Sequence, residues 1–289
     1  SRSLEKHIIN NFNYFKPDLI VLGHADKVGN NILSELKAKN KNLKIFQWFL
    51  DPLSKKGPDY IKNKDRILNN INTIDASFLT TDPLSLDFKI KNSFYIPNPC
   101  DASFETLKNY ERNCYFDLFF AMSHGVHRGV LKKGKFDERE KLIIDLKTKT
   151  PDLKFDLYGI ENTQPIWGDQ FINAISNSKM GINLSRGKPI KYYSSDRIVQ
   201  LTGNGLLTFI HHDTQYQNFF LKDEMIFYKN NNDLIEKLKK YSKDDRLRKK
   251  IAKKGRDKYH KYFNSTLVSE FMINKTLELN NKKKYLWNK

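Results

Sequence analysis

The sequence has little cysteine and no long apolar run, and each absence excludes a class of protein. Its only cysteines, Cys100 and Cys114, form no CxxC pair and predict no disulfide framework, so we expect the reducing environment of the cytoplasm. No apolar stretch approaches the length of a membrane span, and the first residues lack the apolar core of a signal peptide. The remaining composition, 39% hydrophobic and 29% charged, is typical of a globular protein.

Motifs of several well-known enzyme classes are also missing. We find no GxGxxG after a first strand, no Walker lysine loop, no HExxH and no DxD motif for a metal–diphosphate complex. Asp244 and Asp245 are adjacent and are expected in a helical surface stretch. His124 and His127 have the spacing of metal ligands, but no third ligand follows nearby. The sequence therefore predicts no metal site.

Positive charge is abundant: 51 Lys and Arg against 33 Asp and Glu give a formal net charge of +18. This excess favours an anionic partner, such as nucleic acid, an acidic lipid surface or a phosphorylated substrate. A general drift of composition toward Lys, Asn and Ile explains it equally well. Arg-rich clusters with interleaved aromatic residues are missing, so no specific nucleic acid is expected. The tail 282–287 is compatible with a membrane interface or with a frayed, solvated terminus.

Short β-branched or aromatic runs alternate with helical stretches, which predicts βα units and parallel sheets. The strands expected in the first half are 19–22, 44–48, 76–80 and 94–96, with a helix at 31–39. In the second half we expect strands at 115–122, 154–158, 180–184, 206–210 and 225–228, and helices at 136–149, 171–178, 196–202 and from 232 onward.

Two consecutive α/β domains are the simplest architecture that explains this alternation of strands and helices. We assign residues 1–112 to an N-terminal Rossmann-like domain and residues 113–289 to a C-terminal domain, with a linker at 104–113. A first strand and helix are expected upstream of residue 1, and a terminal helix at 265–279 could pack back on the first domain. Ligands bind such sheets at the carboxyl ends of the strands, so loops after strands are the places to seek chemistry.

Polar residues follow two strands of the first half. His24 and Asp26 come just after one strand, and Asp51 ends the next. Their expected place at a carboxyl edge makes them candidate acceptor-side or catalytic groups. Asp51 precedes Pro52 and is equally well a turn residue.

A basic loop with glycines follows the first strand of the second half. It contains His127 and Arg128, and its glycines let the backbone approach a ligand closely. The Arg128 guanidinium can form two parallel hydrogen bonds with phosphate oxygens. The same loop is also compatible with an ordinary strand-to-helix connection.

The segment 194–205 is more informative. Ser194, Ser195 or Asp196 can cap a helix whose first N–H groups face an anion. Arg197 lies in the first turn, where the helix dipole disfavours a cation, and this suggests a compensating anionic ligand. The alternative is that Arg197 points into water. Neither Arg128 nor Arg197 lies on an apolar stripe, so packing does not explain either residue. We expect both to bind diphosphate, and we expect the replacement of either one to change fold stability little.

These residues resemble the CgeB-like group of glycosyltransferases, which is related to the retaining family-4 (group 1) enzymes. The most specific part of the resemblance is 195–207. The first half matches through 16–20 and Asp51-Pro52. The other matching segments are 115–122, His127-Arg128, Leu157-Tyr158-Gly159, 178–184, Phe219-Phe220, 232–234, Arg246, Ile251-Ala252 and Gly255.

The resemblance implies a GT-B fold, with two Rossmann-like parallel-sheet domains facing a central cleft. It implies a retaining transfer of sugar from a nucleotide diphosphate sugar to a glycan, lipid-linked or protein hydroxyl, without a metal or other cofactor. Such an enzyme would act in cell-surface glycan biosynthesis, in the cytoplasm or peripherally at the anionic inner membrane face. It makes residues 1–112 the acceptor-side domain and residues 113–289 the nucleotide-sugar domain. The donor residues are then His127, Arg128, Tyr158, Ser195, Asp196, Arg197 and Gln200. His24 and Asp51 are the catalytic candidates because of their place after strands.

One position departs from the pattern of these relatives. Gln200, five residues before Gly205, stands where a Glu typically meets the nucleotide ribose. An amide can still form a hydrogen bond with a ribose hydroxyl. The alternatives that stay open are a non-catalytic GT-B-like binding or scaffold protein, a basic nucleic-acid-binding protein and, as a minor one, a sugar-nucleotide epimerase.

Overall fold

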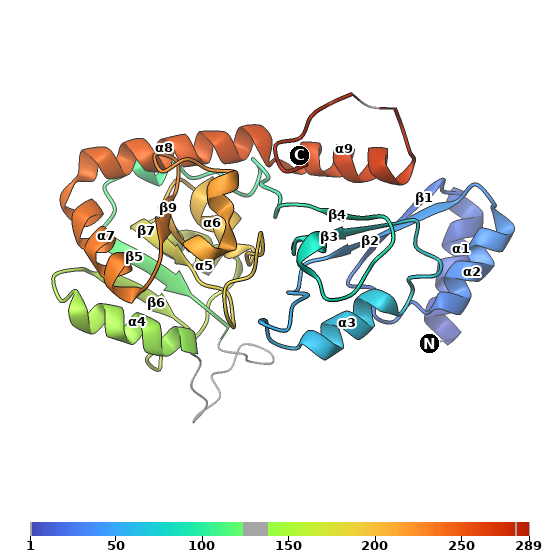
Figure 1. Ribbon diagram of the computed structural model, residues 1–289, viewed down its shortest axis with the longest axis horizontal. Coiled ribbons are helices and arrows are strands. Elements are labelled where there is room, and N and C mark those ends of the chain that lie inside the picture. Colours follow the sequence, from blue (N-terminus) through green and yellow to red (C-terminus); the bar gives the residue numbers. More distant parts are fainter. Residues whose placement is uncertain (1, 124–137, 281, 289) are drawn as a thin grey trace. The chain divides into compact units, whose positions relative to one another are not determined.

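Two parallel β-sheets organise the chain in the computed structural model, which describes residues 2–123, 138–280 and 282–288 (Figure 1). Each sheet belongs to its own compact unit. The first unit comprises Ser1–Pro97 and Thr266–Lys289, and the second comprises Asn98–Ser265. Among the described residues, no helix combines the length and the apolar character needed to cross a membrane.

The first unit has a four-stranded sheet in the order β1-β2-β3-β4, with every pair parallel. All four strands lie where the sequence predicts them, but α1 and α3 were not predicted. The N-cap residue of α3, Asp59, forms no side-chain cap hydrogen bond. The strands are β1 (Leu19–Gly23), β2 (Lys44–Phe49), β3 (Ala76–Leu79) and β4 (Ser93–Tyr95), and the helices are α1 (Arg2–Phe15), α2 (Asn30–Lys39), α3 (Tyr60–Leu68) and α9 (Ser265–Thr276).

The end of the chain packs into an aromatic cluster of the first unit. The Phe271 ring, on α9, lies 6.1 Å from the ring of Phe78 and 6.0 Å from that of Phe94. Tyr285 and Trp287 pack against Phe271 and are only 8% and 5% exposed. The expectation of a solvated or membrane-interface tail is therefore wrong, because these two aromatic side chains are buried against the protein itself.

The second unit has a five-stranded parallel sheet in the order β6-β5-β7-β8-β9. The predicted strands are confirmed, and the predicted terminal helical stretch is divided at Asp244, whose carboxylate accepts a hydrogen bond from Leu247 N and caps α8. The strands are β5 (Phe116–Ala121), β6 (Phe155–Tyr158), β7 (Ser178–Asn183), β8 (Leu207–His211) and β9 (Ile226–Tyr228), and the helices are α4 (Glu138–Lys149), α5 (Gly168–Ile175), α6 (Arg197–Gly203), α7 (Asn231–Lys243) and α8 (Asp245–Tyr262).

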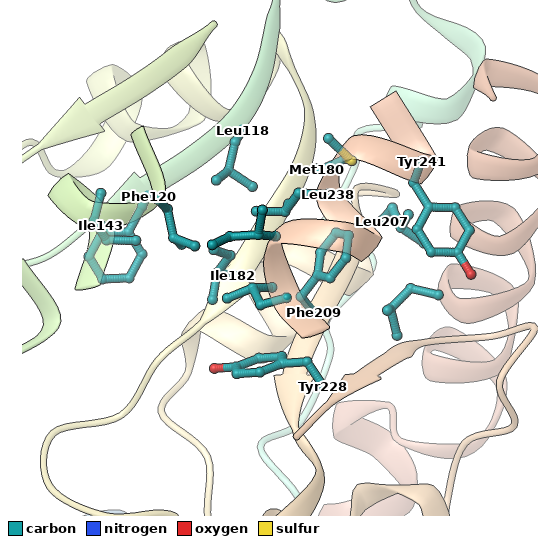
Figure 2. Close-up of a cluster of buried hydrophobic side chains, with 14 of the residues drawn as sticks. Leu118, Phe120, Ile143, Met180, Ile182, Leu207, Phe209, Tyr228, Leu238 and Tyr241 are labelled. Carbon is teal, nitrogen blue, oxygen red and sulfur yellow. The ribbon is translucent and has the colours of Figure 1, made fainter. Parts of the chain in front are cut away.

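Hydrophobic side chains cover both faces of this second sheet, as a parallel sheet requires. One face packs against α4, α7 and α8 (Figure 2). The other face packs against α5 and α6, through Phe119, Ile175 and Leu201 among others. Burial on both faces explains the continuous apolar runs from which these strands were predicted. It also leaves the strand ends as the places where polar groups of this sheet reach solvent.

The segment expected to be a linker, 104–113, lies inside the second unit. Asn109 is fully buried, and its Nδ2 donates to the carbonyls of Ile175 and Ser178 at 2.7 and 2.8 Å. Arg256 Nε donates to the carbonyl of Leu107 at 2.9 Å. These bonds attach the segment to the second unit, and the division between the units follows Pro97 instead.

Gly255 shows how closely α8 approaches its neighbours. A Cβ built on Gly255 would lie 2.2 Å from the carbonyl oxygen of Glu224, a main-chain atom that cannot move aside cheaply. Glycine is a poor helix residue by about 1 kcal/mol relative to alanine. We conclude that close packing, and not helix propensity, accounts for glycine at this position.

We predict that Gly255→Ala lowers the free energy of unfolding by about 1–3 kcal/mol, because overpacking outweighs the gain in helix propensity. Urea unfolding followed by circular dichroism measures this change. Lys250→Ala, at an exposed position of the same helix, is the matched control and should change stability by less than about 0.5 kcal/mol. A stabilised Gly255→Ala protein would contradict the packing described here.

Candidate functional site

A hydrogen-bonded network lies at the carboxyl end of β7, in the second unit. Asn183, the last residue of β7, donates from Nδ2 to Ser194 Oγ at 2.7 Å. Ser195 Oγ donates to Asn183 Oδ1 at 3.3 Å. Asn183 and Ser194 are 4% and 1% exposed, so this network is largely enclosed. It fixes the backbone just before α6, where the sequence predicts the nucleotide site.

Arg197 completes this network from the first turn of α6. Its Nε and Nη2 donate to the carbonyl of Ala121, at the end of β5, at 3.1 and 2.9 Å. Its Nη1 donates to the carbonyl of Leu184, just after β7, at 2.7 Å, and to Ser195 Oγ at 3.1 Å. The guanidinium carbon also lies 4.9 Å from the centre of the Phe120 ring. The alternative that Arg197 points into water is wrong, because main-chain carbonyls of two strand ends accept its hydrogen bonds. The same bonds argue against the expectation that its replacement would change fold stability little.

Asp196 and Gln200 present polar side chains on the same short helix. Asp196 is exposed and its carboxylate forms no capping hydrogen bond, which corrects the expectation of a side-chain cap there. Gln200 is half-buried, and its main-chain N–H donates to the carbonyl of Asp196. Its side-chain amide forms no hydrogen bond within the described part of the chain. That amide is therefore free to bind a ligand.

Tyr158 ends β6, directly beside Ala121 of β5. Burial, together with the neighbouring Asp156 carboxylate and its hydrogen bond, raises the pKa of Tyr158 to about 12. Its ring lies 6.1 Å from that of Phe119, in the cluster that packs against α5. The phenol stays protonated at neutral pH, and the ring packs against its aromatic neighbour, so Tyr158 has a structural role at this edge.

His127 and Arg128, the remaining donor-side candidates, lie outside the described residues. At the end of β8, His211 accepts a hydrogen bond at Nδ1 from Asp213 N at 3.2 Å, as a residue next to a turn does. Within the residues that the structure describes, no three His, Cys, Asp or Glu side chains gather as a metal site.

A second polar cluster lies in the first unit, around Arg66 of α3. Its Nε and Nη2 form a bidentate ion pair with Asp26, at 2.9 and 2.7 Å. Its Nη1 donates to Asp51 Oδ2 at 3.2 Å, and its Nη2 lies 3.0 Å from His24 Nδ1. The hydrogen bond from Arg66 lowers the pKa of Asp26. The catalytic candidates His24 and Asp51 are therefore brought together, and the residue that joins them is one that the sequence did not single out.

An open pocket of about 310 Å³ lies beside this cluster. His24 and Asp26 line it from the loop after β1, Trp48 and Phe49 from the end of β2, and Arg66 from α3. The parallel register of β1 and β2 places Gly23 beside Trp48, which brings the two strand ends together. Arg66 is hard to find from sequence, because it is one basic residue among 51 and lies on a helix without a cap signal.

Comparisons with known proteins agree with this architecture. A family described as glycosyl transferase-like matches residues 139–273. No curated protein sequence matches the chain. Among solved structures, HepE from Anabaena has a TM-score of 0.64 and 11% identity, over 96% of this chain and 81% of HepE. A glycosyltransferase from Rickettsia africae has a TM-score of 0.60 and 13% identity, over 96% of this chain and 81% of its own.

TarM, known from S. aureus, has a TM-score of 0.60 and 13% identity over 93% of this chain. The match covers 57% of TarM, so this chain spans little more than half of that protein. At such identities the likeness shows the fold, which is α/β with two parallel sheets, as in the GT-B glycosyltransferases. The predicted fold class is confirmed.

We predict that Arg197→Met lowers the free energy of unfolding by about 2–4 kcal/mol, because it leaves the carbonyls of Ala121 and Leu184 without their charged donor. Urea unfolding measures the change. Arg246→Met, at an exposed position of α8, is the matched control and should leave the midpoint nearly unchanged. Equal midpoints for the two variants would show that Arg197 does not hold the strand ends together.

Proposed function

We propose that this protein is a glycosyltransferase that transfers a sugar from a nucleotide diphosphate sugar to a hydroxyl acceptor. The observation that carries the proposal is the extent of the glycosyl transferase-like match, 139–273. That segment contains the ends of β6, β7, β8 and β9 and the whole of α6. These are the elements that form the carboxyl edge of the second sheet, where ligands of parallel α/β sheets bind.

The donor that we propose to test first carries uridine diphosphate. HepE was solved with UDP, with UDP and glucose, and with UDP-glucose, and TarM was solved in a complex that includes UDP. In this chain we assign the donor to the second unit. The amide of Gln200 can both donate to and accept from a ribose hydroxyl, and Ser195 and Asp196 lie beside it at the start of α6.

Diphosphate binding is assigned to His127 and Arg128, because the donors of Arg197 are occupied by the protein. Arg197 then acts as a positioning residue that holds the ends of β5 and β7. When the sugar leaves, negative charge builds on the departing diphosphate, and preorganised cationic groups stabilise it. We propose that the reaction retains the anomeric configuration and needs no metal ion, as the family resemblance implies.

The acceptor is assigned to the first unit. His24 and Asp51 lie around Arg66 at the carboxyl ends of β1 and β2, beside the open pocket. We propose a glycan, lipid-linked or protein hydroxyl as the acceptor. The net charge of +18 would suit a reaction at the anionic inner face of a membrane, reached from the cytoplasm.

One observation favours a second candidate function, a non-catalytic protein that binds sugar nucleotides. It is Gln200, which lacks the carboxylate expected at this position. Incubation with UDP-glucose and UDP-N-acetylglucosamine separates the two candidates. Release of UDP, or transfer of sugar, supports the enzyme, whereas saturable binding without any turnover supports the binding protein.

We predict that UDP binds and that Arg128→Ala weakens its binding about ten- to a hundredfold, since a hydrogen bond to a charged group contributes roughly 1.5–3 kcal/mol. Calorimetric titration measures both affinities. Uridine, which lacks the phosphates, should bind the variant and the parent equally, and Arg246→Ala should leave the UDP affinity unchanged. Equal UDP affinity in Arg128→Ala and the parent would remove Arg128 from the diphosphate site.

We also predict that turnover continues in excess EDTA, because the proposed site neutralises the diphosphate with protein groups. Rates of UDP release from the donor are compared before and after chelation and after adding Mg²⁺ or Mn²⁺. Activity that disappears with EDTA and returns with either metal would overturn the metal-free mechanism.

A further inference from the structure

The pocket beside Arg66 is not basic, although the chain as a whole carries a net charge of +18. Two carboxylates, Asp26 and Asp65, and two cations, Lys62 and Arg66, line it. Arg66 is also paired with Asp51, outside the pocket lining. The local charges therefore balance or lean negative, which favours an uncharged ligand over a phosphate group.

Arg66 determines which nitrogen of His24 carries the proton. A guanidinium has only N–H donors, so a contact of 3.0 Å from Arg66 Nη2 requires His24 Nδ1 to accept. The imidazole is then neutral, with its proton on Nε2. In this state Nε2 is a hydrogen-bond donor toward a ligand and cannot accept a proton from a hydroxyl.

The position of His24 is fixed in two further ways. Its backbone is left-handed, with φ of 46°, a conformation that costs a non-glycine residue energy and often marks functional sites. Its ring stacks on that of Phe49, with 5.6 Å between centres and 22° between planes. A strained backbone, a stacked ring and a charged partner together hold one orientation of the imidazole.

Aromatic side chains form part of the pocket lining. The rings of Trp48 and Phe49 line it from the end of β2. Aromatic rings and the neutral N–H donor of His24, beside carboxylates that accept, suit a ligand with several hydroxyl groups. A volume of about 310 Å³ is at the small end for ligand sites and matches one sugar unit better than a nucleotide sugar.

We propose that this pocket binds an uncharged saccharide unit of the acceptor, with His24 donating from Nε2 to a sugar hydroxyl and Arg66 as the positioning residue that sets its tautomer. The proposal rests on the proposed function, because it names the acceptor of that reaction. It also narrows the role of His24 from a candidate catalytic group to a donor that orients the acceptor.

The first test is the tautomer itself, measured in the ligand-free protein at neutral pH. Two-bond ¹H–¹⁵N correlation spectra distinguish the two neutral forms of histidine, and His24→Gln identifies the signals. We expect the Nε2–H form in the parent and in Lys62→Met, and a mixture of forms in Arg66→Met. An Nδ1–H or a protonated His24 in the parent would overturn the proposal, whether or not Arg66→Met folds.

The second test uses the His24 signals to detect binding. The probes are methyl glycosides of glucose, galactose, mannose and N-acetylglucosamine, with glucose 6-phosphate as the charged comparison. We expect at least one glycoside to shift these signals saturably, at least tenfold more tightly than glucose 6-phosphate, and Arg66→Met to weaken it at least tenfold. No response to any glycoside, or tighter binding of the phosphate, would overturn the proposal. Sugar transfer is assayed separately, so binding here without transfer counts against the proposed function alone.

Discussion

The carboxyl edge of the second sheet depends on one interaction, the contact of the Arg197 guanidinium with the ends of two strands. Within the described part of the chain, this group donates to the main-chain carbonyls of Ala121 and Leu184 and to Ser195 Oγ. Carbonyls at the carboxyl end of a parallel sheet point toward the ligand side and need donors. Arg197 supplies these hydrogen-bond donors from the first turn of α6. It thereby fixes that helix relative to β5 and β7.

Close packing beneath α6 strengthens the same arrangement. A Cβ built on Gly181 of β7 would lie 2.3 Å from Leu201 Cδ2, so the helix rests almost on the strand backbone. At the end of the helix, Gly205 has φ of +78° and faces the Tyr110 ring. The Asn183–Ser194–Ser195 network closes the remaining side. The position of Gln200 is consequently defined by packing on one side and by hydrogen bonds on the other.

Arg66 shows how local partners modify the effect of a charged side chain. Its guanidinium is paired with the carboxylates of Asp26 and Asp51, and the lining of the pocket beside it carries no excess of positive charge. The net charge of +18 is therefore a poor guide to the first unit, because charge acts through its local partners.

The sequence by itself determined the alternation of strands and helices, since apolar runs must be buried on both faces of a parallel sheet. It also placed His24, Asp51, Ser195 and Gln200 after strands or at a helix start. It did not reveal α3, whose N-cap Asp59 makes no side-chain cap bond, nor the role of Arg66 on that helix.

Only the tertiary structure decided which of these groups meet. The partners of Arg66 lie 15 to 42 residues away, and Ala121 lies 76 residues from Arg197. Such pairs follow from the parallel register of neighbouring strands, which brings distant strand ends to one edge. Local sequence patterns carry no information about these separations, because they reflect only the period of the element in which a residue lies.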